Sequence, residues 1–155
     1  MQEAGGMGAA RPGYGGGGMG VVRAYALIFG IVYAAVALLE LILGDDGLEI
    51  GGAQILLLEP LQNTVHWIIA VVVLGSFFAG ENAARMVARI VGIVLVVLAI
   101  YGFVASDTLG DLLGYAGEGA AFPAAYNWVH LLSGLVALFA GLFASRTYAS
   151  RPAAA

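Results

Sequence analysis

Cysteine and lysine are both missing from this chain of 155 residues, and charged residues of any kind are scarce. Without cysteine there is no disulfide, no thiolate metal ligand and no thiol nucleophile. Charged residues make up 10% of the chain and apolar residues 61%, whereas about a quarter of a typical soluble domain is charged. A surface facing water needs many more charges, so the composition predicts a membrane protein. The formal net charge of −4 also argues against a nucleic-acid partner.

Long apolar segments account for this composition. They lie at about residues 22–43, 63–79, 85–105 and 126–145. A transmembrane helix needs about 20 apolar residues, and about 17 suffice with modest bilayer thinning. The second segment is the shortest, because Pro60 is expected to begin a new turn rather than sit inside a helix. The sequence therefore predicts an all-α membrane protein, a four-transmembrane-helix up-down bundle over residues 22–146.

The two ends of the chain are predicted to lie outside this domain. Residues 1–21 are rich in glycine and poor in large apolar side chains. They cannot bury enough surface to offset the entropy of ordering, so we expect a disordered tail. The apolar run after Arg23 is longer than the h-region of a signal peptide and has no cleavage site, so an uncleaved helix is predicted. Residues 147–155 form a second, short tail.

The arginines predict the orientation in the membrane. They are Arg11, Arg23, Arg85, Arg89, Arg146 and Arg151. In a four-span topology all of them fall on one side, whereas the opposite loops, 44–62 and 106–125, carry acidic residues and no arginine. Because arginine-rich segments stay in the cytoplasm, we expect a multi-pass protein of the cell (inner) membrane with both tails cytoplasmic.

The two halves of the chain resemble each other. The pattern R-x6-G-I-V begins at Arg23 and again at Arg85, 62 residues later. The pattern N-x-V-H begins at Asn63 and again at Asn127, 64 residues later. A repeat of two spans returns the chain to the same side, so its symmetry axis runs along the membrane normal. The pattern predicts two parallel two-helix repeats, with the histidine of each N-x-V-H motif at the same depth.

The paired Asn-x-x-His motifs resemble those of a bacterial family of small four-helix integral membrane proteins, known only as a domain of unknown function. The residues that carry the resemblance are Asn63, His66, Asn127 and His130. It covers about residues 23–146, and the second span departs from the pattern with Ala70 where the fourth has Gly134. The resemblance implies a four-helix membrane fold and brings no established activity.

His66 and His130 are the first candidate site residues, since ionisable groups inside a membrane are costly and usually face the protein interior. Neutral imidazoles on symmetry-related helices could ligate a metal or haem iron, or bind another ligand. The alternative is structural, with each histidine bonded to a neighbouring helix or loop and with Asn63 and Asn127 as N-caps. A duplication would preserve both motifs by descent, so the pairing is not independent evidence for a shared site.

Glu40 is the one carboxylate inside a predicted span, about one turn from the outer end of the first. At a depth similar to that of the histidines, it could complete a Glu–His–His ligand set for a divalent metal. Alternatively, Glu40 reaches the lipid headgroups or pairs with a single histidine.

Two further groups are expected to serve the membrane and the packing. Arg85 and Arg89 lie one turn apart at the inner end of the third span and are predicted to contact anionic lipid headgroups. Ser133, Ala137 and Gly141 recur at a spacing of four in the last span. Small residues at this interval predict close helix packing.

No phosphate-binding loop, nucleophile elbow or HExxH motif occurs in the sequence. We therefore expect a non-catalytic accessory or structural protein without a cofactor, whose partners are the bilayer and either another protein or further copies of itself. One alternative is a redox or metal/haem-binding protein that uses His66 and His130. Another is a small transporter, which needs a homo-oligomer because four helices leave little room for a pore.

Overall fold

The computed structural model describes residues 19–43, 48–50, 53–56, 59–113 and 124–143. Their elements are α1 (Val21–Leu43), β1 (Leu48–Ile50), β2 (Ala53–Leu56), α2 (Pro60–Ala79), α3 (Glu81–Val104), α4 (Ser106–Leu113) and α5 (Ala124–Phe143). The tail expected at residues 147–155 and most of that expected at 1–21 lie outside the described residues.

The helices α1, α2, α3 and α5 are each long and apolar enough to cross a membrane, with 20 to 24 residues apiece. At about 1.5 Å per residue, the shortest of them span about 30 Å, the thickness of a bilayer's hydrocarbon core. Large apolar side chains cover the outward faces. Val71, Phe78 and Val104, for example, are all more than 60% exposed. The predicted all-α membrane protein with four transmembrane helices is therefore confirmed.

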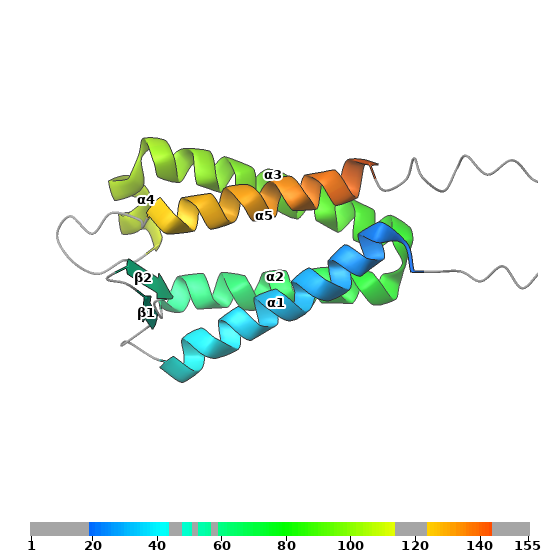
Figure 1. Cartoon of the computed structure of the whole chain (residues 1–155), viewed down its shortest axis with the longest axis horizontal. Coiled ribbons are helices and arrows are strands. Elements are labelled where there is room, and N and C mark those ends of the chain that lie inside the picture. The colour runs from blue at the N-terminus through cyan, green and yellow to red at the C-terminus, as the bar shows by residue number, and fades with distance from the viewer. Residues whose placement is uncertain (1–18, 44–47, 51–52, 57–58, 114–123, 144–155) are drawn as a thin grey trace, which may run out of the picture.

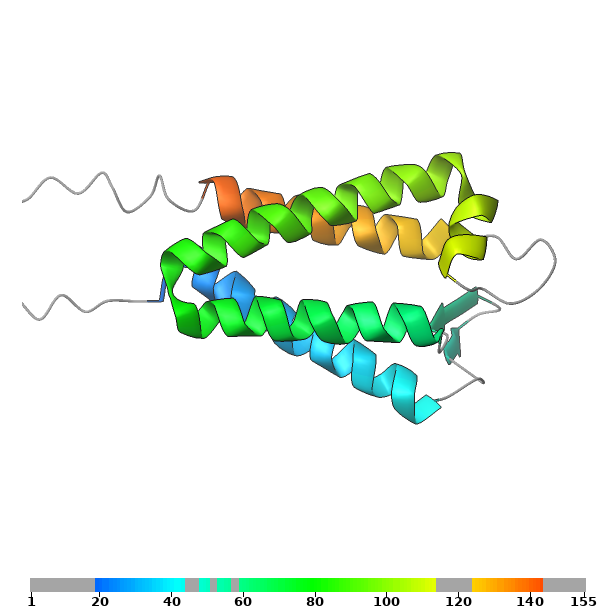
Figure 2. The same ribbon diagram turned by 180° about the vertical axis from the view of Figure 1, so that it is seen from behind.

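The four long helices run alternately up and down, so α1 begins and α5 ends at the same end of the molecule (Figure 1). We call this end the terminal end. The short hairpin β1–β2 and the helix α4 lie at the opposite end, here named the loop end (Figures 1 and 2). Within this arrangement α1 packs chiefly against α2, and α3 packs chiefly against α5. The molecule thus consists of two helix pairs.

Glycine permits the close approach within each pair. A Cβ atom added at Gly30 of α1 would lie 2.9 Å from the Cα atom of Leu74 in α2. One added at Gly92 of α3 would lie 2.9 Å from the backbone nitrogen of Leu138 in α5. Both glycines therefore put helix backbone against helix backbone, the contact that favours association in lipid.

The turn between α2 and α3 depends on Gly80. Its φ angle is 102°, a conformation that other residues rarely adopt, and its N–H donates to the carbonyl of Ser76 to end α2. The chain therefore reverses direction at a single residue, and α3 begins at Glu81 rather than at the predicted residue 85.

The starts of α2 and α5 also differ from the prediction. Pro60 is the first residue of α2 and Glu59 its N-cap, because proline's fixed φ angle suits the first helical position. Asn63 therefore lies inside the helix, and its predicted capping role is wrong. Asn127 is likewise inside α5, which already begins at Ala124.

The loops at 44–62 and 106–125 hold short elements. The strands β1 and β2 pair antiparallel, with Ile50 opposite Ala53. Helix α4 buries Leu109 against Tyr126 of α5. This contact anchors α4 to the loop end of the second helix pair.

A matched pair of glycine substitutions tests the packing. We expect Gly92→Ala to lower the thermal unfolding midpoint in detergent, because its methyl group would overlap the backbone of α5 and such overpacking costs about 1–3 kcal/mol. Gly75→Ala is the control, since a Cβ atom there has no neighbour within 4 Å. It should raise the midpoint slightly, because alanine favours helix by about 1 kcal/mol over glycine. A Gly92→Ala variant as stable as Gly75→Ala would contradict this view of the helix contact.

Candidate functional site

Glu40 is buried inside the first helix pair, with 1% of its surface exposed. The Nδ1 atom of His66 lies 2.9 Å from one Glu40 carboxylate oxygen and 3.0 Å from the other. Asn63 donates from its side-chain nitrogen to Glu40 at 3.1 Å and to the carbonyl of Ala37 at 2.8 Å. We call Glu40, Asn63 and His66 the Glu40 network. It ties α1 to α2, and it pairs Glu40 with a single histidine.

The second helix pair cannot repeat this network. The position equivalent to Glu40 is Gly102, 62 residues later, which has no side chain. A Cβ atom at Gly102 would collide with the side chain of Asn127, which is 2% exposed and occupies that space. The position in α3 that corresponds to Glu40 therefore carries no carboxylate, although the motifs around His66 and His130 match.

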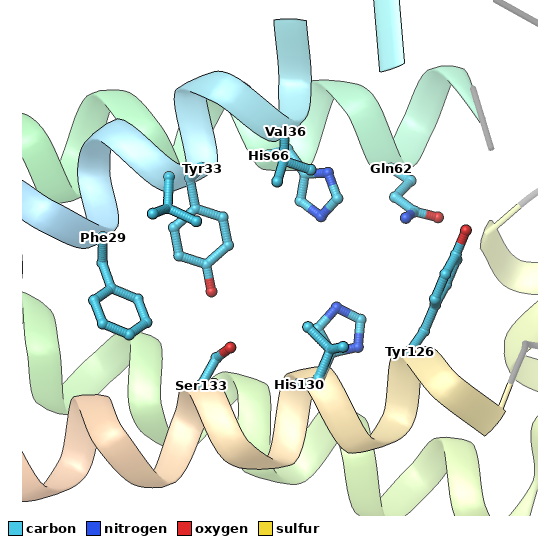
Figure 3. A pocket seen from close by; sticks show the side chains of 10 residues that line it. Phe29, Tyr33, Val36, Gln62, His66, Tyr126, His130 and Ser133 are labelled. Atoms are coloured by element: carbon cyan, nitrogen blue, oxygen red, sulfur yellow. The ribbon is translucent and has the colours of Figure 1, made fainter. Parts of the chain in front are cut away.

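A cavity of about 280 Å³ lies between the two helix pairs. Its lining residues are Phe29, Val32, Tyr33, Val36, Gln62, His66, Tyr126, Val129, His130 and Ser133. His66 from α2 and His130 from α5 point toward each other across it (Figure 3). The hydroxyl group of Tyr33 points toward Ser133 on one side of the histidines, and Gln62 and Tyr126 lie on the other (Figure 3). The structure thus brings the two predicted histidines to one cavity.

A smaller cavity of about 60 Å³ adjoins the same histidines. It shares Tyr33, Gln62, His66 and His130 with the larger cavity. Its remaining walls are apolar residues of α2, α3 and α4. Those walls are Val65, Ile69, Val94, Leu95, Leu98 and Leu113. Each histidine is the seventh residue of its helix, about 9 Å from its start at the helical rise. The imidazoles therefore occupy matching positions in α2 and α5, and both border the two cavities.

The predicted Glu–His–His ligand set is not formed. Among the described residues, no group of three or more histidine, aspartate or glutamate side chains could hold a metal ion. The reason is geometric: Glu40 lies behind His66, at its Nδ1 atom, rather than in the cavity. Haem does not fit either, because a cavity of about 150 Å³ holds a single benzene ring, and a porphyrin with its four pyrrole rings exceeds the space of about 280 Å³.

The chemistry that remains is neutral hydrogen bonding. In the neutral tautomer that donates Nδ1–H to the Glu40 carboxylate, the Nε2 atom of His66 carries a lone pair and can accept a hydrogen bond. The hydroxyl groups of Tyr33 and Ser133 can donate or accept. The cavity thus offers donors and acceptors among apolar walls.

The arginines bind helix ends. Arg23 donates to the carbonyl of Phe77 at 3.2 Å, and Arg89 donates to that of Gly141 at 2.9 Å. Both carbonyls lie in the last described turn of their helices, and arginine side chains commonly bind carbonyls near a helix C-terminus. Arg85 lies 3.6 Å from Glu81 in an exposed ion pair. Sequence reasoning missed the carbonyl contacts, and the lipid-headgroup role of Arg85 and Arg89 stays a prediction.

The small residues of α5 have divided roles. Ala137 and Gly141 are buried, and a Cβ atom at Gly141 would lie 3.1 Å from the backbone nitrogen of Arg89 in α3. Ser133 instead lines the cavity, and its neighbour Gly134 makes the close contact with α3. The packing prediction is therefore wrong for Ser133, because the face toward α3 is displaced by one residue.

The larger lining side chains Phe29, Tyr33 and Gln62 were not singled out from the sequence. Tyr33 lies seven residues before Glu40 in α1, two helical turns away on a similar face. Gln62 lies four residues before His66, one turn away. This helical spacing from the known polar residues is the signal that could have identified them.

A double-mutant cycle tests the Glu40 network. Glu40→Ala and His66→Ala should each destabilise the protein, because each leaves a buried polar partner without its bond. The double variant should lose less stability than the sum of the two single losses. We expect a coupling of about 0.5–3 kcal/mol in the free energy of unfolding, measured by detergent titration. Glu40→Ala combined with Arg89→Ala, at the terminal end, is the additive control. Additivity between Glu40 and His66 would refute the pairing.

Comparison with known proteins gives one match. The family described as Domain of unknown function (DUF4383) matches residues 23–143. No curated protein matches the chain, and no solved structure does. The matched segment includes nearly all of α1 and runs to the last residue of α5, so it contains the Glu40 network and both cavities. The chain belongs to the DUF4383 family, a membrane-protein family whose domain has no assigned function.

Proposed function

We propose that this chain is a non-catalytic accessory protein of the bacterial inner membrane, and that it acts by binding a molecule between its two helix pairs. One observation carries the proposal: several polar side chains of the spans line one cavity. Polar groups inside a membrane are costly, and those that persist usually face a binding site or pathway. Six polar side chains line the space of about 280 Å³, namely Tyr33, Gln62, His66, Tyr126, His130 and Ser133.

The arrangement supports binding rather than reaction. A nucleophile needs a base within hydrogen-bonding distance and a third group that orients the base. Glu40 orients His66, but the hydroxyl of Ser133 lies beside the hydroxyl of Tyr33 rather than at His66 (Figure 3). Within the described residues, Glu40 and His66 could serve as orienting group and base, but no nucleophile lies at His66.

We further propose that the two helix pairs are copies of one two-helix repeat, related by an axis along the membrane normal. Matching contacts support this. Gly30 packs on Leu74 in one pair, and Gly92 packs on Leu138 in the other. The glycines are 62 residues apart and the leucines 64, the same offsets as in the sequence motifs. The cavity would then lie at the interface of the repeats, as substrate sites do in many repeat-built membrane proteins.

The terminal end is proposed to face the cytoplasm, and the loop end the exterior. This orientation is supported by the arginines, since Arg23, Arg85 and Arg89 all lie on the terminal-end halves of their helices. Both tails would then be cytoplasmic.

Single-cysteine labelling tests the orientation without interference, because the chain has no cysteine. Asn82 at the α2–α3 turn and Thr108 in α4 are both exposed. A membrane-impermeant maleimide should label Thr108→Cys in intact spheroplasts, and label Asn82→Cys only after lysis. The reverse pattern would overturn the orientation.

The binding role is tested by a variant that fills the cavity. Val129 lines the cavity, and Val97 of α3 does not, although both side chains are 59% exposed. Wild type, Val129→Phe and the control Val97→Phe should be purified in polymer discs cut from native membranes, and their small molecules compared by mass spectrometry. We expect at least one species at near-stoichiometric amount in wild type and Val97→Phe, and its loss in Val129→Phe. Identical profiles for all three proteins would contradict binding in the cavity.

A metal-binding protein is the second candidate, and the Glu40 network favours it. A metal-ligating histidine usually donates its other N–H to a carboxylate, as the Nδ1 atom of His66 is placed to do with Glu40. Metal analysis of the same preparations separates the two proposals. Stoichiometric metal that is lost in both His66→Gln and His130→Gln would favour the second candidate over the first.

A further inference from the structure

We infer that the cavity between the helix pairs binds the headgroup of a quinone or quinol drawn from the bilayer, with its hydrocarbon tail leaving between α1 and α5. This inference rests on the proposed binding function and names its ligand class. Four properties of the cavity carry it: its charge, its size, its hydrogen-bonding groups and its opening.

The charge of the lining selects a neutral ligand. None of the described residues that line the cavity is an arginine, a lysine, an aspartate or a glutamate. Glu40 is excluded from the surface of the cavity by His66 and is 1% exposed. A phosphate or carboxylate headgroup would find no cationic partner here, and a cation would find no exposed carboxylate. A neutral molecule remains.

The size of the cavity selects a small ring system. A cavity of about 150 Å³ accommodates one benzene ring, so the cavity of about 280 Å³ is suited to two fused rings or to one heavily substituted ring. Phe29, Val36 and Val129 contribute apolar walls from α1 and α5. Flat apolar surfaces of this kind favour a planar headgroup.

The hydrogen-bonding groups match a headgroup with oxygen atoms on opposite edges. Tyr33 and Ser133 lie on one side of the histidines, and Gln62 and Tyr126 lie on the other (Figure 3). Hydroxyl and amide groups can donate to a carbonyl oxygen. The Nε2 atom of His66 can accept from a hydroxyl group in the tautomer that donates Nδ1–H to Glu40. Both the quinone and the quinol form therefore have complementary partners, and binding needs no redox step.

The opening of the cavity faces the lipid. Val32 of α1 and Val129 of α5 line the cavity, yet they are 49% and 59% exposed. Side chains that both line a cavity and reach the outer surface form its rim. The rim is apolar and lies within the spans, so a molecule with a hydrocarbon tail can enter sideways from the bilayer and keep its tail in lipid.

Binding of short quinones to the full chain in detergent tests the inference. The probes are 2-methyl-1,4-naphthoquinone and its hydrocarbon counterpart 2-methylnaphthalene, which has the same rings and no oxygen. Equilibrium dialysis against empty micelles corrects for partition into detergent. We expect saturable binding of the naphthoquinone, at least tenfold tighter than that of the hydrocarbon, because two or more hydrogen bonds are lost in the latter.

Variants place the binding in the cavity. His130→Leu should weaken naphthoquinone binding about tenfold by removing a polar group from the lining, and His130→Gln, which keeps an amide there, should weaken it less. Val129→Phe should abolish binding, whereas the lipid-facing Val97→Phe should leave it unchanged. Thermal unfolding of each variant shows that it is folded.

Several results would overturn the inference. They are no saturable binding to wild type, equal affinity for the naphthoquinone and the hydrocarbon, or equal binding by Val129→Phe and Val97→Phe. These failures are distinct from failure of the proposed function. If Val129→Phe removes a co-purifying molecule that is not a quinone, the binding role stands and the ligand class proposed here falls.

Discussion

A polar group inside a bilayer has no water to bond with, so each one must find its partner within the protein. The Glu40 carboxylate meets this requirement through both Asn63 and His66 on the facing helix. The guanidinium groups of Arg23 and Arg89 meet it by binding the last carbonyls of α2 and α5. These bonds join α1 to α2 and α3 to α5. The need to satisfy polar groups therefore holds each helix pair together, and the two pairs are joined by fewer such bonds among the described residues.

Packing reinforces the same division. Apolar side chains gain little from leaving lipid for another helix, so association depends on how closely backbones approach. Gly30 and Gly92 provide that approach within the pairs, against Leu74 and Leu138. Between the pairs stand larger side chains such as Tyr33 and the two histidines. The cavity follows from this distribution. The small residues let the helices within each pair pack closely, whereas the larger side chains keep the two pairs further apart.

The sequence predicted the elements well and their rotation poorly. Length and hydropathy located four spans, since a membrane imposes both, and the motifs placed His66 and His130 at one depth. The side of the helix on which a residue lies, toward the cavity or toward a neighbouring helix, depends on where the helix begins and on which helix packs against it. Pro60 begins α2 three residues early and turns Asn63 from a cap into a ligand of Glu40. Ser133 lines the cavity because Gly134 takes the contact with α3. Such differences of one to three residues arise from tertiary contacts that a single sequence does not display.

The departure from symmetry between Glu40 and Gly102 gives the cavity two different walls. If the repeat were perfect, two equivalent imidazoles would face each other with the same freedom to donate or accept. Glu40 removes that equivalence, because it holds His66 at Nδ1 and leaves its Nε2 atom as an acceptor. The side chain of Asn127 occupies the corresponding space beside Gly102, so His130 is held by other contacts. A ligand with one donating and one accepting edge would therefore bind in a single orientation. On the proposed duplication, two equal halves would enclose a symmetric cavity, and the difference between Glu40 and Gly102 is what would orient the proposed ligand.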